Sequence, residues 1–133
     1  MKSVHSDPDT VGFKFGFPEV GNVSYTSDTQ YFDEIGDYYE GARLVILCVM
    51  RSRGSQWKGH MLTSNLMKKV NGVKPETVII THFGMKMIFG NPAEEAKFIE
   101  KQTGVPTVAA LDGMWVDVGR EIHFVTKRRR QRV

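Results

Sequence analysis

Residues 78–84 read VIITHFG, and this stretch decides the fold. Three consecutive apolar residues followed by threonine predict a buried β-strand, because no polar residue interrupts the run. The strand ends where His82 enters a Phe-Gly corner, so the sequence places an imidazole at the end of a rigid element.

Two other segments place a metal-binding type of side chain near a predicted strand. Alternating residues over 23–26 predict a strand that runs into Asp28, and His5 stands shortly before a strand predicted over 11–15. Imidazole and carboxylate groups both suit zinc, and strand ends hold them rigidly. His5, Asp28 and His82 are therefore the candidate metal ligands.

Each of these residues also has an ordinary structural interpretation. His5 lies near a terminus and, taken alone, reads more readily as an exposed histidine than as a ligand. Asp28 in a Ser-Asp-Thr sequence is typical of a turn or a helix cap. His82 after an apolar strand reads as a core histidine with a hydrogen-bond partner. Taken singly, the three residues leave both interpretations open.

Length and composition indicate one soluble globular domain. The chain has 133 residues, of which 41% are hydrophobic and 25% charged. Its single cysteine, Cys48, excludes a disulfide within the chain and a cysteine-based zinc site, and fits a reducing cytoplasm. We expect no signal peptide and no membrane span, because the longest apolar run, 44–50, has seven residues where roughly 20 are needed.

The basic residues are concentrated in a C-terminal tail. Residues 127–132 hold five of the 18 lysines and arginines, and all 15 acidic residues precede them. A run of this kind is commonly solvated and disordered. It also suits the phosphates of a nucleic acid, so nucleic-acid binding by the tail stays open.

Strand and helix patterns alternate along the chain, which predicts an α/β fold with helices packed on a mixed sheet. The run 44–49 shows no alternation and predicts a strand buried on both faces. The Asp112-Gly113 pair favours a tight turn, so 105–111 and 114–118 are predicted to form a β-hairpin. Helices are predicted over 31–39, 59–71 and 91–103.

Four motifs, in this order, resemble the C-terminal half of a metallo-β-lactamase-fold hydrolase, close to the ribonuclease Z branch. They are YTSDT at 25–29, GH at 59–60, IITHFG at 79–84 and ALDGM at 110–114. The resemblance assigns 1–119 to that half domain and leaves 120–133, with the basic tail, unmatched. It implies half of an αββα sandwich: one mixed sheet with helices on one face and an apolar opposite face.

The resemblance also implies the roles of individual residues. Asp28 matches the aspartate that bridges two metal ions, and His82 matches the last metal-binding histidine. His5 matches a lone histidine before a Gly-aromatic strand, and His60 resembles a histidine that assists proton transfer to the leaving group. The implied cofactor is a pair of zinc ions, which generate a hydroxide that hydrolyses a phosphodiester or another ester-type substrate.

One part of the family pattern is missing. The His-x-His-x-Asp-His loop that supplies most metal ligands is absent, and the only histidines are His5, His60, His82 and His123. We therefore expect a partial chain that is inactive alone and is completed by a second chain, or a homo-oligomer formed through the exposed sheet face. The alternative is a non-catalytic remnant or interaction module that binds nucleic acid through the basic tail.

Overall fold

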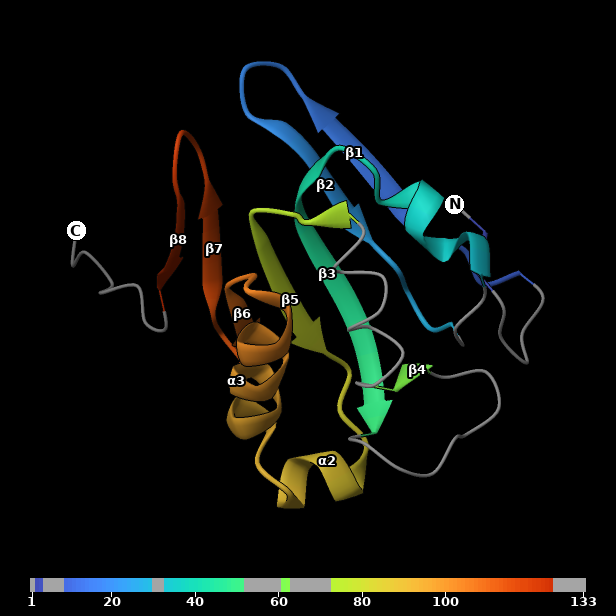
Figure 1. Cartoon of the computed structure of the whole chain (residues 1–133), viewed down its shortest axis with the longest axis vertical. Helices are drawn as coiled ribbons and strands as arrows, with labels where there is room; N and C mark the ends of the chain where they lie inside the picture. Colours follow the sequence, from blue (N-terminus) through green and yellow to red (C-terminus); the bar gives the residue numbers. More distant parts are fainter. Residues whose placement is uncertain (1, 4–8, 30–32, 52–60, 63–72, 126–133) are drawn as a thin grey trace, which may run out of the picture.

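A mixed β-sheet forms the centre of the protein (Figure 1). The computed structural model describes residues 2–3, 9–29, 33–51, 61–62 and 73–125. The strands lie in the order β1-β2-β3-β5-β6, with β4 beside β3. β1 is antiparallel to β2, and all other neighbours are parallel. The bounds are β1 (Phe13–Phe17), β2 (Gly21–Tyr25), β3 (Ala42–Arg51), β4 (Met61–Leu62), β5 (Thr77–Thr81) and β6 (Thr107–Ala109).

The main core lies on one face of this sheet, under the helical elements. These are the 3₁₀ helix η1 (Asp33–Tyr38) and the α-helices α2 (Met85–Phe89) and α3 (Pro92–Thr103). Each contributes at least one fully buried apolar side chain to a single cluster with β3 and β5: Ile35, Val45, Leu47, Val49, Val78, Ile80, Met87 and Ile99. This confirms the α/β class and the predicted placement of helices on one face.

Helix α3 begins and ends where the sequence predicts. Asn91 caps it by accepting a hydrogen bond from the Ala93 amide at 3.1 Å, and Pro92 occupies the first turn. Gly104, with φ of 71°, ends the helix, because this left-handed conformation costs glycine little. The helix predicted over 91–103 is therefore confirmed.

The opposite face of the sheet is apolar, as predicted, and among the described residues of the sheet its most exposed large side chains lie on β1. Phe13, Phe15 and Phe17 stack along β1, and each is 48% exposed. In the middle of the same face the side chains are buried: Leu44, Cys48 and Ile79 are at most 3% exposed. Among the described residues of the central sheet, the most exposed part of this face is therefore the three phenylalanines, and partly exposed side chains such as Ile46 lie among the buried ones.

The predicted hairpin over 105–118 is wrong, although its turn is present. The Met114 amide bonds to the Leu111 carbonyl at 3.0 Å, and Gly113 has a φ of 77°. The segments on either side of this turn, however, join different sheets. β6 pairs in parallel with β5, whereas β7 (Trp115–Val118) pairs with β8 (Ile122–Val125) in a separate two-stranded sheet.

Two predicted helices also differ from the structure. The helix predicted over 31–39 is the 3₁₀ helix η1 within the described residues. In the helix predicted over 59–71, Met61 and Leu62 instead form β4 beside β3, and the remaining positions lie outside the described residues. The short helix α2 was not predicted. None of the helices that the structure describes is long and apolar enough to cross a membrane.

Arg43 ties the turn between β7 and β8 to the main sheet. Its guanidinium donates hydrogen bonds to the Gly119 carbonyl at 2.7 Å, to the Arg120 carbonyl at 3.1 Å and to the Val20 carbonyl. The Glu76 carboxylate accepts two further bonds from it, at 2.7 and 3.1 Å. This pairing raises the pKa of Arg43 and lowers the pKa of Glu76, so both groups are charged near neutral pH.

Replacing Arg43 with methionine should release the β7–β8 turn while leaving the central sheet intact. The Val20 carbonyl and the adjacent Gly119 and Arg120 carbonyls lose their shared donor, and no described backbone group replaces it. We expect faster amide hydrogen exchange in β7 and β8 with unchanged exchange in β3 and β5. Lys97→Met, which removes an exposed ion pair with Glu94 on α3, is the matched control. Unchanged exchange in β7 and β8 would contradict the assigned role.

Candidate metal centre

Asp28 and His82 meet at the carboxyl edge of the central sheet. Asp28 follows β2 and His82 follows β5, and both strands run parallel to β3, which lies between them. Asp28 Oδ1 is 3.1 Å from His82 Nε2. The predicted proximity of these two side chains is therefore confirmed. Both remain reachable from solvent, since the Asp28 side chain is 32% exposed and that of His82 is 44% exposed.

Unusual backbone conformations direct both side chains to this meeting point. Ser27 and His82 each have a φ of 59°, in the left-handed region that residues other than glycine seldom adopt. Both residues lie just after strands, since β2 ends at Tyr25 and β5 ends at Thr81. Such conformations cost free energy and are concentrated at functional sites. One occurs at His82 itself and the other at the residue before Asp28, so each sets the direction in which the chain continues after its strand.

Thr26 holds the end of β2 against β3. Its amide bonds to the Ile46 carbonyl at 3.0 Å, and its hydroxyl accepts from the Cys48 amide at 3.1 Å. The side chain is almost fully buried. These contacts continue the parallel ladder past Tyr25 and fix the segment that carries Asp28. The sequence analysis included Thr26 in a motif without assigning it this role.

Gly84 brings the corner after His82 into direct contact with β3. Its amide donates to the Met50 carbonyl at 2.9 Å. A side-chain carbon added at Gly84 would lie 2.8 Å from the same carbonyl oxygen, closer than real contacts allow. Only glycine permits this approach, so the Phe-Gly corner fixes the loop that carries His82.

The buried Cys48 is a structural neighbour of the site. Its thiol donates to the Tyr25 hydroxyl at 3.5 Å, and this bond, with burial, raises the pKa of Tyr25 to about 12. Burial also raises the pKa of the Cys48 thiol. Both groups therefore stay protonated near neutral pH, and neither is a thiolate or phenolate that could act as a nucleophile.

The separation of Asp28 and His82 fits two ligands of one ion. Two atoms that each bind zinc at about 2.0–2.1 Å lie roughly 2.8–3.4 Å apart, the lower end for neighbouring ligands in octahedral geometry and the upper end for tetrahedral geometry. The observed 3.1 Å falls within this span. No third histidine, cysteine, aspartate or glutamate joins the pair among the described residues. His5 and His60 lie outside them, and His123 lies beside Glu121 near the β7–β8 turn.

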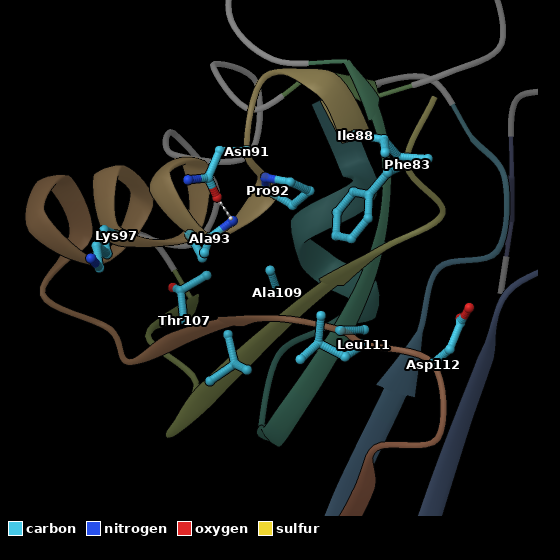
Figure 2. A pocket seen from close by; sticks show the side chains of 13 residues that line it. Phe83, Ile88, Asn91, Pro92, Ala93, Lys97, Thr107, Ala109, Leu111 and Asp112 are labelled. Carbon is cyan, nitrogen blue, oxygen red and sulfur yellow. Dashed lines mark hydrogen bonds between the residues drawn. The ribbon is translucent and has the colours of Figure 1, made fainter. Parts of the chain in front are cut away.

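An open groove leads from His82 toward the start of α3. A cavity of about 360 Å³ beside His82 is lined by Phe83, Ile88 and Leu111 among others. These three residues also line a larger cavity of about 610 Å³, which extends along β6 to the first turn of α3 (Figure 2). The two cavities are therefore adjacent. This groove was not predicted from the sequence, because α2, which forms part of its wall, carries no recognisable local signal.

Comparison with solved structures identifies the fold. The chain resembles the metallo-β-lactamase fold protein YhfI from Bacillus subtilis, with a TM-score of 0.73 and 19% identity over 83% of this chain and 45% of that protein. It resembles the metallo-hydrolase Igni18 from Ignicoccus hospitalis, with a TM-score of 0.52 and 20% identity over 96% and 52%. A diphosphatase of the PhnP family gives a TM-score of 0.50 and 18% identity over 69% and 35%. The chain thus has the metallo-β-lactamase fold over about half the length of such proteins.

Sequence comparison adds one relative. An uncharacterized protein of Methanocaldococcus jannaschii is 32% identical over 116 residues, which are 86% of this chain and 42% of that protein. No protein-family model matches the sequence.

Proposed function

We propose that this chain forms part of a metal-dependent hydrolase of the metallo-β-lactamase superfamily. The observation that carries the proposal is the 3.1 Å approach of Asp28 to His82 at the carboxyl edge of the sheet. The four ordered motifs and the fold support it. Zinc, the proposed metal, supplies a bound hydroxide near neutral pH and stabilises negative charge that develops on the substrate.

The proposed roles follow from the chemistry of each side chain. The Asp28 carboxylate supplies negative charge and two acceptor oxygens, which suits a ligand shared between two cations. His82 supplies an imidazole nitrogen, and its Nε2 lies 3.1 Å from Asp28 Oδ1. His60, outside the described residues, is the proposed proton donor to the leaving group, and His5 is a proposed additional ligand.

A complete site needs more ligands than the described residues supply. A catalytic zinc takes about three protein ligands and a water. We propose that the missing ligands come from a His-x-His-x-Asp-His loop on a complementing half, which is either another segment of a longer polypeptide or a second chain. The half-exposed phenylalanines of β1 offer an apolar surface for that half. A second copy of this chain on the same surface is the competing assembly.

The proposed reaction is hydrolysis of a phosphodiester or a related ester. The PhnP-family neighbour is a diphosphatase, which favours phosphate chemistry. Assignment to the ribonuclease Z branch rests on the motifs alone and is part of the proposal. One fold supports many substrates, so the assay must begin with a generic ester.

The decisive experiment compares the isolated chain with the protein purified from its own cells together with any accompanying subunit. We expect the isolated chain to bind zinc weakly and to leave bis(p-nitrophenyl) phosphate intact. The co-purified assembly should contain zinc and hydrolyse the ester. Tight stoichiometric zinc with turnover in the isolated chain would overturn the partial-site proposal. An assembly with neither zinc nor activity, which binds RNA or DNA through residues 127–132, would overturn the hydrolase proposal.

A further inference from the structure

We infer that the groove beside His82 binds an uncharged apolar group of the substrate, an alkyl or aryl substituent on the ester that is hydrolysed. The inference rests on the proposed function and adds the class of substrate to it. Its basis is adjacency: the cavity beside His82 and the larger cavity share Phe83, Ile88 and Leu111 in their linings. Among the cavities lined by described residues, this larger one adjoins His82 and offers space for the remaining part of a substrate whose reacting atom lies there.

The lining of the groove is complementary to an apolar group. Figure 2 shows Phe83, Pro92, Ala109 and Leu111 around the cavity. The small side chains of α3 and β6 leave the space open, and its size of about 610 Å³ falls in the range of small-molecule sites. Ile88 and Leu111, on either side of the cavity, are each more than half exposed. Water is in contact with apolar surface here, and an apolar substituent that displaces it gains free energy.

The polar side chains of the groove do not favour a polyanion. Lys97 and Asp112, its two charged residues, lie at opposite ends (Figure 2). Lys97 lies 3.6 Å from Glu94, so part of its charge is already balanced. The Asn91 side chain is engaged in capping α3. A row of nucleic-acid phosphates needs several unbalanced cations, which the described lining does not offer.

The kinetic test compares two diesters with the same leaving group, methyl p-nitrophenyl phosphate and hexyl p-nitrophenyl phosphate, on the co-purified assembly. Each buried methylene contributes roughly fourfold in affinity, so burial of two or three gives about a 15–60-fold larger kcat/KM for the hexyl ester. Ala93→Trp places an indole in the groove from an exposed position and should remove most of this preference. Gln102→Trp, on the same helix and outside the groove, should leave the ratio unchanged.

A binding measurement separates this inference from the proposed function. Hexylphosphonate and methylphosphonate are titrated while the methyl signals of Ile88, Ala93 and Ala109 are followed by NMR. Shifts with the hexyl compound alone, abolished by Ala93→Trp, support the groove even if neither ester is hydrolysed. Turnover with equal kcat/KM for both esters would overturn the inference and leave the hydrolase proposal standing. Absence of shifts with the hexyl compound would also overturn the inference. If Ala93→Trp weakened assembly with the complementing half, the groove would be a protein-binding surface, and the inference would again be wrong.

Discussion

Asp28→Ala should remove both bound metal and hydrolytic activity from the assembled protein. In the proposed site the Asp28 carboxylate is shared between two ions, so its loss weakens both coordination shells. The loss of metal affinity and of activity should exceed the roughly 10–100-fold loss caused by altering a residue that only hydrogen-bonds to a metal ligand. Metal content by atomic emission and kcat with bis(p-nitrophenyl) phosphate are the two measurements. Asp117→Ala, at an exposed position of β7, is the matched control and should retain both.

The double variant Asp28→Ala/His82→Ala sharpens this test. If the two residues hold one ion, either single substitution already releases it, and the second adds little. The structure supports this expectation because the two side chains lie 3.1 Å apart. If the losses of activity in the two single variants simply add in the double variant, or if Asp28→Ala keeps its full metal content, the pair is an ordinary surface ion pair. Exposed pairs of that kind contribute about 1 kcal/mol or less to stability.

The parts of the fold that were predicted correctly have strong local signals. The run 44–49 is apolar throughout, and β3 is buried on both faces. Asn91, Pro92 and Gly104 mark the ends of α3 through capping chemistry that depends only on nearby residues. The approach of Asp28 to His82 was also predictable, because parallel strands bring their carboxyl ends to one edge.

The parts that were missed depend on contacts distant in the sequence. Asp112-Gly113 forms the predicted turn, but the parallel register between β5 and β6 takes 107–109 into the main sheet. The strand after the turn then pairs with β8, which no local pattern marks as its partner. Helix α2 has five residues and no side-chain cap, so the sequence carries little signal for it. Its position follows from Met87, which is buried in the core.

Gly84→Ala should impair activity although Gly84 lies outside the proposed coordination shell. The added methyl would sit 2.8 Å from the Met50 carbonyl oxygen and 2.9 Å from a carbon of the Met50 side chain. The side chain can move aside, but the carbonyl belongs to β3, so the loop from His82 to Gly84 must shift. A displacement of about 1 Å at a reacting group can cost roughly 100-fold in rate. We expect a loss of about 10–100-fold in kcat.

Gly119→Ala is the matched control, because its nearest neighbour would be the Glu121 carbonyl oxygen at an ordinary 3.9 Å. It should keep full activity. The free energy of unfolding distinguishes a misplaced His82 from a destabilised fold. Overpacking costs about 1–3 kcal/mol of stability, and denaturant unfolding of both variants measures this cost. If Gly84→Ala loses activity while the folded fraction stays above 95% at the assay temperature, the shifted loop has misplaced His82. Full activity in a folded Gly84→Ala protein would show that the close approach to Met50 does not position the metal-site histidine.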